Sequence, residues 1–199
     1  MKKILTLIIA LIMCVLCFAS CSKADDYVPA GYKKASNDNA DYDLFVPSGW
    51  TVDMSTGVTT AYASDRSNIS FVGFELDDTI IRFDPVTTGG EESSESGDEN
   101  KDAEDIKTVE DYWKYYESTF SSTFSDMEYL TNGENMLLSG IEAKKYAYKA
   151  TVTEIEYVFL QVVAIKDKTV YVYTYTAREN LYESHLGEVD EMIGYLNIK

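Results

Sequence analysis

Few residues in this chain can do chemistry on their own. The 199 residues include 3 cysteines, 1 histidine and 34 acidic residues. Cys14, Cys17 and Cys21 all lie in the first 21 residues, whereas His185 lies close to the other end. A metal site that needs two histidines is therefore excluded. A Ser-His-acid triad would have to use His185, and no Gly-x-Ser-x-Gly motif accompanies it, so we predict no catalytic residues.

Cys21 is the one cysteine whose surroundings predict a reaction. Two lysines open the chain, residues 4–19 are apolar with one exception, and Ala19 and Ser20 directly precede Cys21. A positive start, an apolar core and small residues before a break are typical of an export signal. Sixteen helical residues span about 24 Å, which is short of the roughly 30 Å hydrocarbon core of a membrane. A transient span is therefore favoured over a permanent one.

This arrangement predicts a bacterial lipoprotein signal, in which the chain is cut before the cysteine and the thiol takes a diacylglycerol. Phe18 and Ser20 depart from the commonest residues at their positions. Cys14 and Cys17 follow large residues and would leave with the signal peptide, residues 1–20. We predict lipid attachment at Cys21 and a location on the outer face of a bacterial cell membrane, in a Gram-positive organism. The alternatives are a secreted protein that is cut nearby and an uncleaved anchor.

The net charge of −17 limits the possible partners. A surface with this negative charge repels phosphate backbones, and we therefore predict no nucleic acid partner. It also repels anionic lipid head groups. Contact with the membrane would then depend on the lipid anchor. Basic peptides, cations and cationic surfaces are compatible with this charge, although plain solubility is the commonest reason for acidity.

Composition divides the predicted mature chain into a tether and a domain. Residues 21–40 are polar and show no periodicity, which predicts a flexible tether with a typical span of about 25 Å. Residues 41–199 are predicted to form a single domain. Within it, residues 87–105 contain Gly, Ser and acidic residues and no large apolar residue, which predicts a disordered acidic loop.

The acidic loop contains a fragment of a calcium-binding pattern. Asp98, Asn100 and Asp102 alternate as they do at the start of a calcium loop. However, Ala103 stands where the sharp turn of such a loop needs Gly. We therefore favour a solvated acidic loop and predict no metal and no cofactor.

Alternating apolar residues predict that most of the domain is β-sheet. The expected strands are residues 42–46, 57–63, 69–76, 79–83, one or two strands within 127–138, then 143–152, 155–165 and 169–176. Ser139-Gly140 and residues 166–168 are expected to form turns. Because residues 155–165 are nearly all apolar, we place them at the centre of the sheet.

Two helices complete the expected elements. Thr108 can cap the first with Asp111 three residues later, and its apolar residues recur at helical spacing. These are Val109, Tyr112, Trp113, Tyr116, Phe120 and Phe124. The second helix is expected from about Asn180. The first stripe could grip a ligand, and the row of Tyr171, Tyr173 and Tyr175 could form a platform for a sugar or peptide. Packing within the core is the favoured interpretation of both.

The predicted fold class is α+β, with an antiparallel β-sheet flanked by helices on both faces. The pattern resembles the PsbP-like family, which includes Mog proteins and DcrB-type lipoproteins. The resemblance depends on the Phe45-x-Pro47-x-Gly49-Trp50 element, helix 108–125, the strands ending at Val152 and Tyr175, and the closing helix. It implies an α/β/α sandwich and binding or accessory roles without a shared catalytic set.

The favoured function is therefore a non-catalytic binding or accessory module, anchored to the membrane, whose partner is another protein or an extracellular ligand. One alternative is a hydrolase of cell-wall or glycan material with paired carboxylates, which would need a deep pocket with two facing acids. The other is a lipoprotein that delivers a small ligand, which would need a closed apolar cavity beside the sheet.

Overall fold

The computed structural model describes residues 27–54, 57–76, 106–120, 124 and 126–199. The chain divides into two compact units, Met1–Ala30 and Gly31–Lys199, and the fold described below is that of the second. Cys21, the predicted strand 79–83 and the acidic loop 87–105 lie outside the described residues. Their predictions are therefore not tested by the structure.

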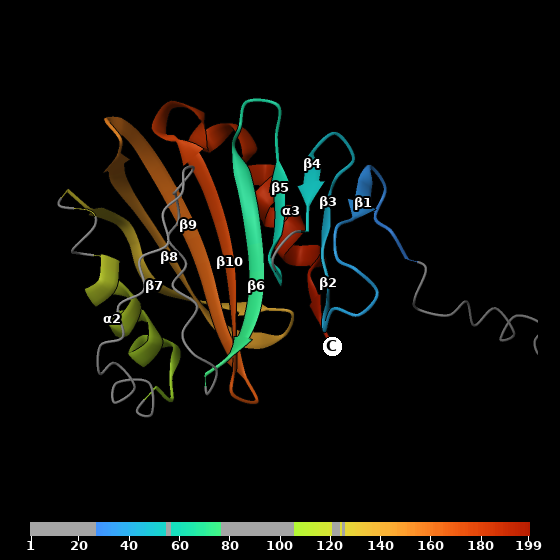
Figure 1. The fold of residues 1–199 in the computed structure, drawn as a ribbon, viewed down its shortest axis with the longest axis horizontal. Coiled ribbons are helices and arrows are strands. Elements are labelled where there is room, and N and C mark those ends of the chain that lie inside the picture. Colours follow the sequence, from blue (N-terminus) through green and yellow to red (C-terminus); the bar gives the residue numbers. More distant parts are fainter. Residues whose placement is uncertain (1–26, 55–56, 77–105, 121–123, 125) are drawn as a thin grey trace, which may run out of the picture. The chain divides into compact units, whose positions relative to one another are not determined.

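The centre of the second unit is a seven-stranded antiparallel sheet, with the strands in the order β4-β5-β6-β10-β9-β8-β7 (Figure 1). Its strands are β4 (Thr51–Asp53), β5 (Thr59–Tyr62), β6 (Asn68–Glu75), β7 (Glu128–Leu138), β8 (Ile141–Val152), β9 (Ile155–Lys166) and β10 (Thr169–Arg178). The apolar strand β9, predicted at the centre of the sheet, lies between β8 and the middle strand β10 and is buried along most of its length.

Two short strand pairs accompany the large sheet. β1 (Tyr32–Lys34) pairs with β3 (Phe45–Pro47), and β2 (Tyr42–Asp43) pairs with β11 (Asn197–Ile198). The single strand predicted for residues 42–46 is therefore wrong, because its two halves pair with different partners. The alternation that suggested one strand is nevertheless real, since Tyr42, Leu44 and Val46 are all buried in one cluster.

The predicted boundary of the tether at residue 40 is also wrong. Residues from Gly31 onward belong to the folded unit, and Ala35 is only 1% exposed. The backbone N–H of Ala35 donates to the carbonyl of Leu44 at 2.7 Å. The polar side chains of this stretch suggested a tether, but backbone hydrogen bonds hold it in the folded unit.

The helices in the described part of the chain are α2 (Val109–Phe120), the 3₁₀ helix η3 (Glu179–His185) and α3 (Leu186–Tyr195). The closing helix predicted from about Asn180 thus begins as a 3₁₀ helix and becomes α-helical only at Leu186. The region 127–138, predicted as one or two strands, is the single strand β7, with register shifts between Tyr129 and Thr131 and between Asn132 and Glu134.

Buried residues form two separate clusters on the sheet. One contains Tyr171, Tyr173 and Tyr175 of β10 together with Val189 and Met192 of α3. The other contains Tyr146 and Tyr148 of β8, Phe159 of β9, and Tyr112 and Trp113 of α2. A predominantly antiparallel sheet with few helices is therefore confirmed, and the tyrosine row of β10 belongs to the core.

Candidate functional site

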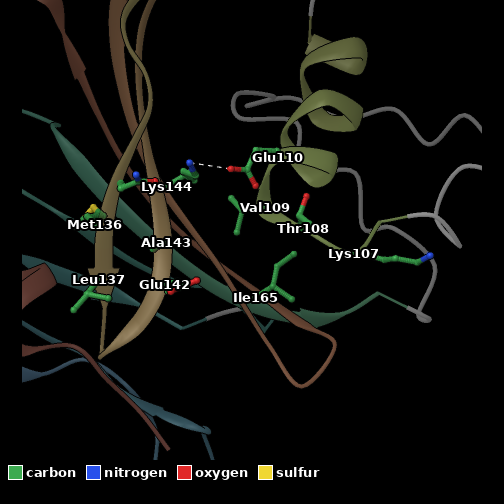
Figure 2. Close-up of a pocket in the computed structure, with 11 residues that line it drawn as sticks. Lys107, Thr108, Val109, Glu110, Met136, Leu137, Glu142, Ala143, Lys144 and Ile165 are labelled. Carbon is green, nitrogen blue, oxygen red and sulfur yellow. Dashed lines mark ion pairs between the residues drawn. The ribbon is translucent and has the colours of Figure 1, made fainter.

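A groove lies between the start of α2 and the hairpin of β7 and β8, with a volume of about 790 Å³ (Figure 2). Its apolar lining includes Val109 of α2, Leu137 of β7 and Ile165 of β9. Figure 2 shows charged side chains around these residues, among them Glu110, Glu142 and Lys144. An apolar centre with a charged rim suits a ligand that has both kinds of group.

The start of α2 is fixed by a reciprocal cap. Thr108 Oγ1 accepts from the backbone N–H of Asp111 at 3.1 Å, and Asp111 Oδ2 accepts from the backbone N–H of Thr108 at 3.0 Å. The cap lowers the pKa of Asp111, mainly through its hydrogen bond with the Thr108 side chain. This confirms the predicted cap and holds one wall of the groove in place.

The opposite wall is the β7–β8 hairpin, which turns in two residues. Ser139 and Gly140 have φ angles of 53° and 79°, as a tight primed hairpin turn requires, and Leu138 pairs with Ile141. Leu138 is fully buried, whereas its neighbour Leu137 is 61% exposed. The hairpin therefore anchors one leucine in the core and presents the next at the groove.

One ion pair crosses the groove. Lys144 Nζ lies 2.8 Å from Glu110 Oε1 and so joins β8 to the first turn of α2. The hydrogen bond from Lys144 lowers the pKa of Glu110, so this carboxyl is ionised at neutral pH. Glu142 lines the same groove. Within the described part of the chain, no ion pair to Glu142 is formed.

Tyr112 and Trp113 of α2 are buried in the core and do not line the groove. The Trp113 indole stacks on the Tyr146 ring, with centroids 3.6 Å apart and planes 4° apart. Trp113 Nε1 donates to the Tyr129 hydroxyl at 3.0 Å, and that hydroxyl donates to Glu117 at 2.8 Å. Burial, followed by the bond to Glu117, raises the pKa of Tyr129 to about 12. The favoured interpretation of the stripe as core is confirmed for Tyr112 and Trp113.

His185 is held on both sides by carboxylates. Its Nδ1 lies 2.7 Å from Glu188 Oε2, and its Nε2 lies 3.0 Å from Asp65 Oδ2. Its ring also meets Trp50 edge to face, with centroids 5.4 Å apart. Burial lowers the pKa of His185, but the hydrogen bonds and charges of Glu188 and Asp65 outweigh burial and raise it.

The contact between His185 and Asp65 was not predicted from the sequence, because Asp65 lies 120 residues earlier in the chain. Asp65 belongs to the loop between β5 and β6, and Glu188 lies on α3, so His185 joins that loop to the closing helix. With both ring nitrogens engaged, the imidazole has no free nitrogen to accept a proton from a substrate. Its arrangement is that of a structural clamp.

Metal binding and membrane crossing find no support among the described residues. Among them, no group of three or more His, Cys, Asp or Glu side chains is arranged to hold a metal ion. Within the same ranges, no helix has both the length and the apolar character needed to cross a membrane. The predicted lipid attachment site, Cys21, lies outside these ranges.

Comparison with known proteins identifies the fold. No family model matches the sequence, and no curated protein matches it. The solution structure of cyanobacterial PsbP (CyanoP) from Synechocystis is similar over 92% of this chain and 99% of its own, with a TM-score of 0.55 and 16% identity. A crystal structure from Bacteroides thetaiotaomicron is similar over 85% of this chain, with a TM-score of 0.51 and 12% identity. This chain covers 49% of that second protein.

These similarities show that the chain has a PsbP-like fold, as the sequence pattern predicted. At these levels of identity they define the architecture and no more.

Proposed function

We propose that this protein is a non-catalytic binding or accessory module with an α/β/α arrangement, which a lipid at Cys21 holds on the outer face of a bacterial cell membrane. The groove between α2 and the β7–β8 hairpin is its recognition surface. The observation that carries the proposal is the exposure of Leu137 beside this groove. A leucine that is 61% exposed beside a concave, partly apolar site offers an apolar contact to a partner.

The α/β/α arrangement is supported by the two buried clusters. Residues of α3 pack with the tyrosine row of β10, and residues of α2 pack with Tyr146 and Tyr148 of β8. Each helix thus buries its apolar side against a different set of sheet residues. Such a sheet has little free surface, and the hairpin and the start of α2 remain for binding.

The charges of the groove support binding over hydrolysis. A glycosidase needs a carboxylic acid whose pKa is raised, so that it can protonate the leaving group. Lys144 instead lowers the pKa of Glu110. A closed apolar cavity for delivery of a small ligand fits less well, since Lys107, Glu142 and Lys144 line the groove.

Photo-crosslinking in living cells tests the proposal. A photo-reactive phenylalanine derivative replaces Leu137 in the full chain, and the matched control carries it at Tyr62, another exposed strand residue with 41% exposure. We expect one defined adduct from position 137 that is absent from position 62, identified by mass spectrometry. The same adducts from both positions, or none from position 137, would contradict a recognition role for the groove.

The hydrolase alternative has its own assay. The purified protein is incubated with cell-wall material, and the release of reducing ends is measured with wild type and with the Glu110→Gln and Glu142→Gln variants. Release by wild type that both variants abolish would replace the proposed function by the alternative.

A further inference from the structure

The outer edge of β7 is open in the described part of the chain. β7 ends the order of the large sheet, and β8 is the strand that pairs with it there. The other side of β7 therefore presents backbone N–H and C=O groups to solvent. An edge of this kind is a template on which another strand can form.

The hairpin turn decides which residues present these groups. In a two-residue hairpin, the residues that flank the turn exchange hydrogen bonds, so Leu138 bonds to Ile141 of β8. Bonded and non-bonded pairs alternate along an antiparallel ladder. Asn135 and Leu137, opposite Lys144 and Glu142, therefore direct their N–H and C=O groups away from β8.

The two halves of β7 differ in how well this edge is protected. The first half contains two register shifts, between Tyr129 and Thr131 and between Asn132 and Glu134. Gly133 lies inside the second shift with a φ of 79°. Bulges of this kind prevent a second strand from pairing. Residues 134–138 pair with β8 in unbroken register and contain no Pro, Lys or Arg, so this half lacks such protection.

The side chains of the open half lie at the groove. Asn135 and Leu137 both line it. Leu137 is opposite Glu142, and Asn135 is opposite Lys144, which reaches α2 through Glu110. A strand added beside residues 134–138 would therefore place every second side chain next to Leu137 and over the groove.

Charge indicates which strand would be added. β7 carries two glutamates, Glu128 and Glu134, and no basic residue, in a protein with a net charge of −17. A second copy of the chain would bring together two bodies that each carry this net negative charge, and they would repel one another. A cationic segment does not meet this repulsion.

We propose that residues 134–138 of β7 accept an extended, positively charged peptide segment of another protein as an additional strand, with an apolar side chain of that peptide against Leu137. This inference rests on the proposed function, since it names the partner chemistry of the same groove. Backbone hydrogen bonds supply affinity in this mode, and the pocket for alternate side chains supplies specificity.

A peptide titration tests the proposal on the full chain purified in detergent. The probe is the capped heptapeptide Lys-Val-Lys-Val-Lys-Val-Lys with a fluorescent label, and its binding is followed by polarisation. The first control is the same peptide N-methylated at alternate residues, which removes the backbone donors of one edge. The second control is a peptide with Glu in place of every Lys. We expect the N-methylated peptide to bind about tenfold more weakly or worse, and the acidic peptide not to bind.

Hydrogen exchange of individual amides is the measurement that distinguishes strand addition from other modes of binding. Saturating heptapeptide should slow exchange at Asn135 and Leu137, whereas Met136 and Leu138 are already protected by β8 and should change little. Slower exchange at the two outward amides only at raised protein concentration, without peptide, would identify a second copy as the occupant. Binding that leaves both amides unchanged would overturn strand addition.

A matched pair of variants isolates the backbone. Leu137→Pro removes an outward N–H without removing a bond to β8, and Leu137→Thr keeps the N–H while losing the leucine side chain. We expect Leu137→Pro to abolish peptide binding and Leu137→Thr to weaken it only in part. If Leu137→Pro does not fold, the N-methylated peptide still shows whether binding needs the backbone hydrogen bonds of an added strand. A crosslink at position 137 in cells together with unchanged amide exchange would leave the proposed function standing and refute the added strand alone.

Discussion

Replacement of Trp113 by Ala should destabilise the protein strongly, because this side chain joins α2 to the sheet. Trp113 is 5% exposed and stacks on Tyr146 with ring centroids 3.6 Å apart. Truncation of a buried Trp to Ala costs about 3–5 kcal/mol. The substitution also removes the Nε1–H that donates to the hydroxyl of Tyr129. We therefore expect the free energy of unfolding to fall by about 4 kcal/mol, a large part of the about 5–15 kcal/mol of a typical domain.

Urea unfolding followed by circular dichroism measures this change. The chain has two tryptophans, so in the Trp113→Ala variant the fluorescence of Trp50 reports on the α3 cluster alone. Trp113→Phe keeps an aromatic ring and loses the hydrogen bond, and it should cost about 1–2 kcal/mol. Lys114→Ala, an exposed change on the same helix, should stay within about 0.5 kcal/mol of wild type. A loss below about 1 kcal/mol for Trp113→Ala would refute the role given to this residue.

Three further predictions concern other parts of the molecule. His185 has a raised pKa in the folded protein, so its contribution to stability is complete below its ordinary pKa of about 6.5 and is lost as the pH rises through the higher folded value. Urea midpoints between pH 6 and pH 9 should show this loss in wild type, whereas a flat difference between wild type and His185→Gln would contradict it. Thr108→Ala should lower the free energy of unfolding by about 1 kcal/mol through loss of the cap of α2, and a circular dichroism melt that matches wild type would count against the cap. Cys21→Ala should abolish labelling by radioactive fatty acid, and normal labelling would rule out the predicted anchor.

Local patterns in the sequence predicted the elements that depend on neighbouring residues. The alternation in residues 143–152 and 169–176, the apolar run of 155–165 and the cap at Thr108 all correspond to observed elements. Each of these signals is contained within about a dozen residues. The hydrophobic period of a strand or helix therefore predicts the element before any tertiary contact is known.

Contacts between distant segments were not predicted from the sequence. β1 has polar residues and no period, and it is a strand because β3 supplies its backbone partners. The clamp of His185 needs Asp65 from a distant loop, and the groove needs α2 and the β7–β8 hairpin together. Side-chain types alone cannot show which segments meet in the fold. The sequence therefore predicted α2 and the strands of the hairpin separately, but not the groove that they form together.

The pairing of β2 with β11 has a consequence for the order in which the chain folds. Lys199 donates from Nζ to the carbonyl of Ala40, 159 residues earlier, and its backbone N–H donates to the carbonyl of Asp41. Contacts over so many residues form slowly, because a long loop has to close first. While the polypeptide is still being synthesised, β2 has no strand to pair with. The β2–β11 pair therefore forms only after synthesis has delivered β11, at the end of folding.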